Sequence, residues 1–461
     1  MKTTDNHIFI GKEDKLNNWA GHKDVDRDEL TEEEMGKLTK KVKELIKNYL
    51  QLDNVNFLFG TGSSIHLGAA SIQNIPSETE KYILDLEDED LKNDFKSYVE
   101  RLQDNMMKKY TPVKDVKFQD DRNWDLIYDG TYIRDYKDIV IPEGEEDSPE
   151  KHYGEVLVMF ESLLNYLTAI TYQKDAEHDE GGGNRVRKLI EALKGSLFLI
   201  CDVHNRITSE RDLKRIEEKK MSDAFAQNKY IFHEKFLKSL MQRPLNLQRA
   251  NIFTSNYDLA FEYAFDNLGI KYIDGFSGFH HRYFKLHGSI SWVSDNKRTA
   301  NNIYGIEEMP IDLIKRKAAD AKENDFGYGN LMIYPTAVKK SYTLDLPYSE
   351  LFRHFAYCTS QPQSVLFTIG YSFCDEHFND IIYQALSNPS FTLIIIDFNG
   401  TKKSEEIKRL RDLNDPRIII LEGDFLGDFL TLADTLMPDF LDASSNDDVA
   451  ETLNKLIVNK E

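Results

Sequence analysis

NVNFLFGTGSS, at residues 54–64, is the stretch that decides the fold. Its short apolar run is typical of a strand buried on both faces, and the run ends in a glycine-rich turn. Such a turn lets backbone amides approach a phosphate, and the positive end of a following helix also favours an anion. The Gly-x-Gly-x-x-Gly spacing is not met, because Ile65 stands at the last position, so a simple tight turn stays open as the alternative.

Further apolar strands follow residue 246, with helical segments such as 257–269 and 375–388 between several of them. They are predicted at 251–256, 271–276, 283–288, 330–335, 364–372, 391–399 and 417–421. Apolar strands that alternate with helices predict an α/β fold with a Rossmann-like doubly wound parallel sheet. Polar and glycine residues gather behind the strand ends, at the edge where such sheets bind ligands.

The remaining segments predict additions to this sheet. Residues 1–35 are polar and acidic and are expected to be flexible or to order late, and a helix is predicted at 32–52. A long, charged, helix-rich region then interrupts the strands. Within that region, 110–150 and the glycines at 181–183 are expected to be loops. The predicted parts are an N-terminal segment with the first helix (1–53), the Rossmann domain (54–77 and 246–435), a large helical insertion (78–245) and a C-terminal tail (436–461).

Composition excludes several classes of protein. The 461 residues carry 58 Lys and Arg against 79 Asp and Glu, a net charge of −21, which disfavours direct binding of nucleic acid by the isolated chain. The basic stretch 214–220 is mixed with acids and is expected to be a solvated helix face. We find no apolar run of about 18 residues and no apolar signal core, so we expect a cytoplasmic protein without a membrane partner. Cys201, Cys358 and Cys374 fit reduced thiols and form no zinc tetrad.

Two strand ends carry candidates for chemistry. Asn256 and Asp258 follow the strand in NIFTSNYD (251–258), although Ser255 or Asn256 could instead cap a helix that starts near Tyr257. His287 ends the strand in YFKLHG, where it could act as a general base near neutral pH or be purely structural.

Two later strand ends add to the set. In LFTIGYSFCDEH (366–377), the run from Cys374 to His377 matches no common metal site, and Asp375 is predicted to cap a helix. In LIIIDFNG (393–400), Asp397 could accept hydrogen bonds from a ribose, or could simply close a strand-to-turn transition.

Taken in order, GTGSS, TSNYD, KLHGS, GYSF and IIIDFN resemble the sirtuin-type (silent information regulator type) NAD-binding domain. The likeness is greatest to the divergent sirtuin-like domains of bacterial antiphage-defence proteins. It covers roughly residues 50–75 and 245–430, and no family likeness is found for 78–245.

The resemblance implies a role for each matching position. Asn256 is implied to orient the nicotinamide ribose and the nucleophile, Asp258 to lie near the nicotinamide amide, and His287 to be the catalytic histidine. The positions matched to the phosphate-binding turns and the adenosine ribose are Gly60, Thr61, Gly62, Ser63, Ser64, Gly370, Ser372 and Asp397, with Asn399 as a second choice for the last.

Departures from the family pattern narrow the implied activity. The two cysteine pairs of the structural zinc module are missing, HLGAASIQNIP (66–76) replaces the Pro-Asp-Phe-Arg stretch, and Ser255 replaces a glutamine. These changes weigh against a protein deacylase. The defence-type relatives lack zinc and cleave NAD+.

The implied function is therefore an NAD+ glycohydrolase that takes NAD+ as substrate, needs no zinc, and acts as a regulated effector of antiphage defence by depleting NAD+. The resemblance also implies a homo-oligomer and a partner such as a HerA-type ATPase or a short Argonaute-associated protein. Two alternatives stay open. One is an NAD or ADP-ribose sensor without turnover, and the other is a nuclease or DNA-binding component of a defence complex.

Overall fold

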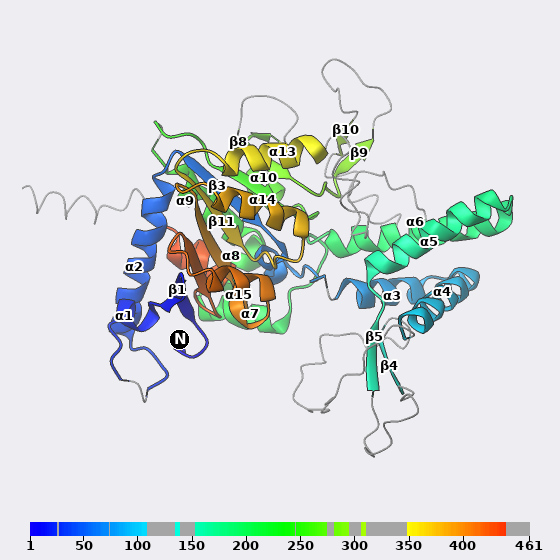
Figure 1. The fold of residues 1–461 in the computed structure, drawn as a ribbon, viewed down its shortest axis with the longest axis horizontal. Coiled ribbons are helices and arrows are strands. Elements are labelled where there is room, and N and C mark those ends of the chain that lie inside the picture. The colour runs from blue at the N-terminus through cyan, green and yellow to red at the C-terminus, as the bar shows by residue number, and fades with distance from the viewer. Residues whose placement is uncertain are drawn as a thin grey trace, which may run out of the picture.

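A largely parallel sheet forms the centre of the protein (Figure 1). The computed structural model describes residues 1–24, 27–72, 74–107, 134–138, 153–244, 246–273, 281–294, 306–309 and 348–438. Within these residues, nine strands form one sheet in the order β2-β1-β13-β12-β11-β3-β6-β8-β7. The strands are β1 (His7–Ile10), β2 (Glu13–Asp14), β3 (Asn54–Phe59), β6 (Asn251–Thr254), β7 (Tyr272–Ile273), β8 (His281–Lys285), β11 (Ser364–Ile369), β12 (Thr392–Asp397) and β13 (Ile418–Glu422). The pairings from β13 to β7 are all parallel, which confirms the predicted Rossmann-like α/β fold.

The order of the strands creates a switch point between β3 and β11. From β3 the chain moves to β6 and β8 on one side, and it later returns to the other side of β3 through β11, β12 and β13. Loops that leave two neighbouring parallel strands in opposite directions open a crevice at their carboxyl ends. The glycine-rich turn after β3 lies at this crevice.

Both faces of the central strands are buried. In β3, Phe57 and Phe59 join one apolar cluster while Leu58, between them, joins the other. The same alternation occurs in β12, where Ile394 and Leu393 belong to different clusters. Side chains of successive strand residues point to opposite faces, so a strand covered on both sides reads as a continuous apolar run.

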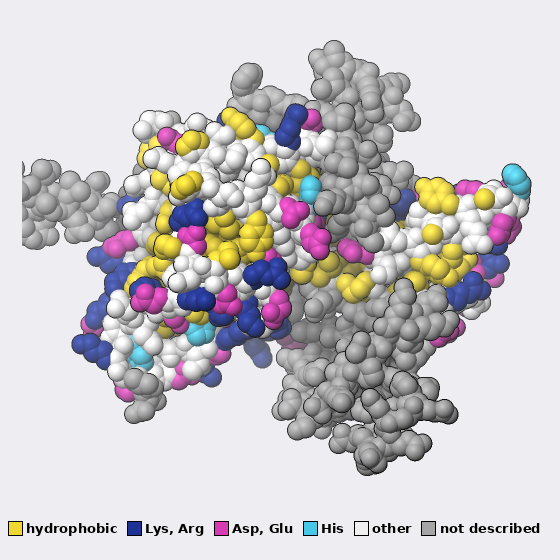
Figure 2. Space-filling model, in the orientation of Figure 1, with side chains coloured by type: hydrophobic (Ala, Val, Ile, Leu, Met, Phe, Trp, Pro, Cys, Tyr) yellow, Lys and Arg dark blue, Asp and Glu magenta, His cyan; other side chains and the backbone are white. Residues whose placement is uncertain are grey.

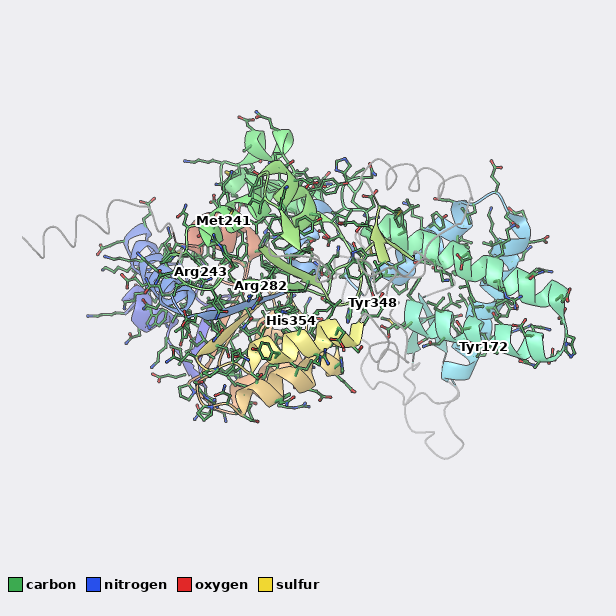
Figure 3. All side chains as sticks on the ribbon, turned by 90° about the horizontal axis from the view of Figure 1, so that it is seen from above. Tyr172, Met241, Arg243, Arg282, Tyr348 and His354 are labelled. Carbon is green, nitrogen blue, oxygen red and sulfur yellow. The ribbon has the colours of Figure 1, made fainter. Side chains whose placement is uncertain are left out.

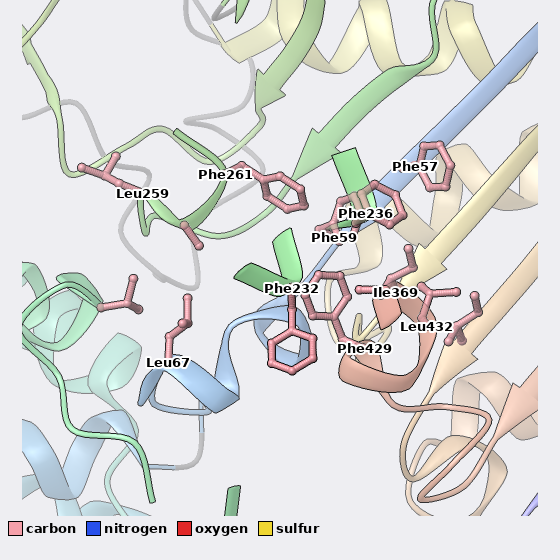
Figure 4. Close-up of a cluster of buried hydrophobic side chains, with 14 of the residues drawn as sticks. Phe57, Phe59, Leu67, Phe232, Phe236, Leu259, Phe261, Ile369, Phe429 and Leu432 are labelled. Carbon is pink, nitrogen blue, oxygen red and sulfur yellow. The ribbon is translucent and has the colours of Figure 1, made fainter. Parts of the chain in front are cut away.

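Helices cover the two faces of the sheet. One face packs against α1 (Leu16–Ala20), α2 (Glu32–Leu50), α9 (Ile231–Met241), α10 (Ala260–Asn267), α16 (Phe429–Thr431) and η5 (Leu432–Leu436). The other packs against α13 (Tyr348–Thr359), α14 (Glu376–Leu386) and α15 (Glu405–Asp412). Figure 4 shows the aromatic centre of the first face, where the rings of Phe57 and Phe236 meet edge to face at 5.2 Å. Such packing fixes α9 rigidly against β3.

Four helices of the region predicted as an insertion project away from the sheet (Figure 1). They are α3 (Ile75–Asp85), α4 (Glu89–Met107), α5 (Phe160–Ala176) and α6 (Glu180–Cys201), and they pack on one another. Figure 3 places Tyr172, which is 72% exposed, toward the far end of this projection. The chain then returns to the sheet through α7 (Glu210–Glu218), α8 (Ser222–Gln227) and α9. None of the helices in the described ranges is both long and apolar enough to cross a membrane.

Two short antiparallel pairs lie outside the main sheet. They are β4 (Arg134–Asp138) with β5 (Tyr153–Leu157), and β9 (Trp292–Ser294) with β10 (Ile306–Glu308). The first pair corrects the prediction of a continuous loop over 110–150. The predicted strand 330–335 and residues 439–461 of the predicted tail lie outside the described residues.

Two further expectations were wrong. The polar start of the chain is not simply a flexible segment, because β1 pairs antiparallel with β13 and buries Ile8 completely. The glycines at 181–183 do not form a loop but belong to the first turn of α6. There the side chain of Asp179 accepts a hydrogen bond from the Gly182 amide at 2.9 Å, a helix cap that offsets the poor helix propensity of glycine.

The basic stretch 214–220 is solvated only in part. Arg215 and Lys219 are half-buried and turn inward, where each forms an ion pair with Asp428, the latter at 4.0 Å. Figure 2 shows basic and acidic side chains interspersed over the body of the molecule. Arg215 and Lys219 therefore form ion pairs within the fold and are not part of a solvated helix face.

Candidate functional site

The predicted site residues lie at the carboxyl ends of five neighbouring strands. In their order across the sheet, they are Asp397 at the end of β12, Gly370 and Ser372 after β11, Gly60 to Ser64 after β3, Asn256 and Asp258 after β6, and His287 after β8. Because these strands are parallel, their ends meet at one edge of the sheet.

Two glycine turns interlock at the switch point. The amide of Gly62 donates to the carbonyl of Gly370 at 3.0 Å, and a Cβ on Gly62 would lie 2.5 Å from the Gly370 Cα. A Cβ on Gly60 would lie 2.5 Å from the Gly370 carbonyl oxygen. Gly370 itself has a φ of +58°, in the left-handed region that favours glycine. The close approach of two backbones requires all three glycines.

Asn256 reaches from β6 into the glycine turn. Its Nδ2 donates to the Gly60 carbonyl at 3.0 Å and lies 3.4 Å and 3.5 Å from the hydroxyls of Ser63 and Ser64. Its Oδ1 is buried and has no hydrogen-bond partner in the described part of the chain. The alternative that Asn256 caps the next helix is wrong, because α10 begins at Ala260 without a side-chain cap.

Asp258 completes a buried polar cluster with Asn256 and Ser64. Its carboxylate accepts from the Ala260 amide at 3.0 Å and from the side chains of Ser64 and Asn256. Burial raises the pKa of Asp258 above its ordinary value, while the charge of Lys285 and these hydrogen bonds pull the pKa back down. The protonation state of Asp258 therefore depends on Lys285 and on its hydrogen bonds with Ser64 and Asn256.

Lys285 supports this cluster by binding the backbone of the loop that carries Asp258, a role that the sequence analysis missed. Lys285 is 1% exposed, and its ammonium group donates to the carbonyls of Tyr257 and Asp258, the former at 3.1 Å. It also contacts Glu262 Oε1 at 2.8 Å, and Tyr283 donates to the other oxygen of that carboxylate at 3.0 Å. The available signal was a lysine inside the apolar run YFKL, where a charge needs a buried partner.

His287 sits in an aromatic enclosure and is 6% exposed. The ring of Phe378 meets it edge to face at 5.1 Å, and Tyr257 lies 6.3 Å away. Its Nε2 lies 3.2 Å from Oδ2 of Asp375. The other oxygen of Asp375 accepts from the His377 amide at 3.0 Å, which confirms the predicted helix cap, whereas the contact with His287 was not predicted.

Comparison with known families identifies this part of the chain. The family model of the SIR2-like domain matches residues 250–415. The chain contains a SIR2-like domain. The matched range begins at β6 and includes Asn256, Asp258, His287 and Asp397, whereas the glycine turn at 60–64 precedes it. Members of this family are NAD-dependent enzymes, so NAD-dependent activity in general is indicated. A search of curated proteins found no match to the chain.

The contacts described for His287 do not include Asn256, Asp258 or Ser64, and two further predicted residues of the SIR2-like domain, Asp397 and Ser372, likewise have their described contacts elsewhere. Asp397 uses Oδ1 to accept from the amides of Asn399 and Gly400, at 2.9 Å and 2.6 Å, and so closes a turn at the end of β12. Ser372 is exposed, and its carbonyl accepts from Ser404 at 3.3 Å. Among the described ranges, no group of three or more His, Cys, Asp or Glu is placed to hold a metal ion.

The helical region also contacts residues 66–68, which follow the glycine turn. Arg206, between α6 and α7, donates to the Gly68 carbonyl at 2.9 Å, and Thr208 donates to the His66 carbonyl at 3.0 Å. The buried rings of His66 and His233 stack at 5.4 Å, and burial lowers the pKa of His66 to about 3. The region that the family match does not cover is thus in direct contact with the turn beside the SIR2-like domain.

Proposed function

We propose that this chain is an NAD+ glycohydrolase that cleaves the nicotinamide–ribose bond to give nicotinamide and ADP-ribose. The observation that carries the proposal is the buried Oδ1 of Asn256, which lacks a partner within the described residues although its amide nitrogen is held by the glycine turn. Buried polar atoms normally form hydrogen bonds, so a buried oxygen without one favours binding of an external donor such as a ribose hydroxyl or a water.

The chemistry needs little acid catalysis. Nicotinamide is already cationic in NAD+, so the C–N bond breaks with its electron pair passing to the ring nitrogen, and the ribose becomes oxocarbenium-like. A water oxygen then bonds to the anomeric carbon and releases one proton. The balance is NAD+ plus water giving nicotinamide, ADP-ribose and H+. What the protein supplies is a fixed pose, exclusion of bulk water and a base for that proton.

The described residues divide these tasks. Asn256 accepts from the ribose or the water through Oδ1, and Asp258 keeps the side chains of Asn256 and Ser64 in place. His287, enclosed by aromatic rings, takes the proton from the water or from a ribose hydroxyl. These three side chains are at most 9% exposed, so bulk water has little access to them.

The test is incubation of the purified chain with NAD+, alone and with candidate partners, followed by chromatography of nicotinamide and ADP-ribose. Asn256→Ala and His287→Ala are each expected to lower the rate by about 10²–10⁴ while they retain the fold. His354→Ala is the matched control, because this half-buried histidine of α13, labelled in Figure 3, also packs on an aromatic ring, Phe284, at 4.6 Å. Full turnover by either site variant would contradict the assignment, and NAD+ binding without turnover by the unaltered chain would favour the sensor alternative.

We further propose that the activity serves antiphage defence and is released by a partner of the HerA-type ATPase or short Argonaute-associated kind. The sequence resemblance supports this, and so do the projecting helices α3–α6, which lie outside the family match and offer surface for assembly. Cells that carry the chain with its neighbouring gene should lose NAD+ after phage infection, whereas cells with His287→Ala should keep it. Unchanged NAD+ in both would refute the defence role.

A further inference from the structure

We propose that Asp375 acts through His287, and that the charge of its carboxylate stabilises the protonated imidazole. The proposal rests on the proposed glycohydrolase function and adds a residue to it. The two side chains come from the end of β8 and the start of α14, and Nε2 and Oδ2 lie 3.2 Å apart.

Asp375 is itself held rigidly. Its backbone is extended, with φ −98° and ψ 108°, and its Oδ1 accepts from the His377 amide as the cap of α14. Its carbonyl accepts from the Tyr371 hydroxyl at 3.3 Å. A carboxylate fixed at one oxygen by a helix cap presents the other oxygen in a constant direction, and this second oxygen is the one that meets His287.

The surroundings of the pair are mainly aromatic. α14 contributes Phe378 and the charged Asp375, α13 contributes Phe352 at 6.1 Å, and the β6–α10 loop contributes the titratable Tyr257. On β8 itself, the ammonium of Lys285 is held by Glu262 and two backbone carbonyls. The side chains of His287 and Asp375 are only 7% and 14% exposed, so their interaction is weakly screened by solvent.

Nε2 of His287 and Oδ2 of Asp375 are in close electrostatic contact, at 3.2 Å, but the ring N–H does not have the geometry of a hydrogen bond to the carboxylate. The carboxylate therefore acts on the imidazole through its charge. It stabilises the imidazolium that forms when His287 takes up a proton, since an opposite charge within about 4–6 Å favours the charged form. Asp375 thus acts through His287 and does not itself touch the substrate.

Asp375→Asn separates this task from the helix cap, because the amide oxygen still accepts from the His377 amide while the charge is lost. The variant is expected to melt close to the unaltered protein, with kcat lowered about 10- to 100-fold and KM little changed. The acidic limb of its pH profile should move down by about one pH unit. Asp375→Ser, which also caps helices, is the second variant if Asp375→Asn fails to fold. The matched control is Glu376→Gln, which removes one charge from the next residue, an exposed position on the same helix.

A readout without substrate separates this inference from the proposed function. Histidine ring signals are followed by NMR through a pH titration, and His287→Gln identifies the signal of His287. Asp375→Asn should lower its titration midpoint by about one unit, whereas Glu376→Gln should leave it in place. A lowered midpoint in a protein that does not cleave NAD+ would refute the glycohydrolase and retain the pair. An unchanged midpoint and an unchanged pH profile would overturn the pair, whatever the turnover.

Discussion

Replacing Lys285 with methionine tests the buried support of the site. The ammonium group holds two carbonyls of the loop that carries Asn256 and neutralises Glu262, which is itself 6% exposed. Methionine fills a similar volume but donates no hydrogen bond, so the carboxylate loses its cation. Breaking one side of a buried ion pair typically costs about 3–5 kcal/mol, and we expect a loss of that size in the free energy of unfolding at pH 8.

The loss should depend on pH in a defined direction. Burial already raises the pKa of Glu262, and removing Lys285, which lowers it, will raise that pKa further. A carboxyl group whose folded pKa is raised contributes stability that is fully present below its unfolded pKa, about 4.3, and is lost as pH rises through the folded pKa. Lys285→Met should therefore be less destabilising at pH 5 than at pH 8, with a slope of at most about 1.4 kcal/mol per pH unit.

Urea unfolding followed by tryptophan fluorescence from pH 5 to pH 8 measures both effects. The double variant Glu262→Gln with Lys285→Met lacks the carboxyl group of Glu262 and should show a flatter pH dependence than Lys285→Met, with the remainder due to Asp258. Lys238→Met is the matched control, because Lys238 is 54% exposed in its pair with Glu234 and should contribute no more than about 1 kcal/mol. A Lys285→Met loss below about 1 kcal/mol, or an equal loss at every pH, would refute the account of the pair.

Two other perturbations test the turn and the core beside it. Gly370→Ala should melt several degrees lower and lose NAD+ turnover, because the new Cβ would lie 2.5 Å from the Gly62 Cα. Gly269 is the control: it has a similar φ of +65° but open space where a Cβ would stand, so Gly269→Ala should cost only about 1 kcal/mol of stability. Equal melting temperatures for the two variants would show that the turns can separate. The pKa of His66 in the folded protein is about 3, below its unfolded value of about 6.5. The unfolded protein therefore takes up a proton first as the pH falls, and the free energy of unfolding should drop by about 2 kcal/mol between neutral pH and pH 5. His66→Leu should reduce that loss of stability, whereas His178→Asn, at an exposed position, should not. Urea unfolding at several pH values measures this, and the same pH dependence in both variants would contradict the prediction.

The sequence predicts the sheet well because burial on both faces leaves an unmistakable apolar run in strands such as β3 and β11. It predicts Asn256, Asp258 and His287 at one edge because parallel strands end together. It misses β1, a four-residue strand whose neighbours are polar and whose pairing with β13 depends on residues at the other end of the chain.

The supporting contacts are missed for a different reason. The pairs Lys285–Glu262 and His287–Asp375 are formed across elements, and each member has an ordinary local interpretation. Asp375 caps a helix whether or not it meets His287, so its capping pattern hides the second contact. Only the fold, which brings α14 beside the end of β8, distinguishes the two roles.

The glycine-rich turn carries less evidence for NAD+ than its sequence suggests. Gly60, Gly62 and Gly370 are all required by the contact between two turns, and this requirement exists whether or not a diphosphate binds there. A glycine pattern at a switch point is therefore compatible with a turn that is purely structural. The same reasoning does not apply to Asn256, whose buried Oδ1 lacks a partner in the described residues. The case for dinucleotide chemistry consequently depends on the amide and the imidazole, and variants of these two side chains test it most directly.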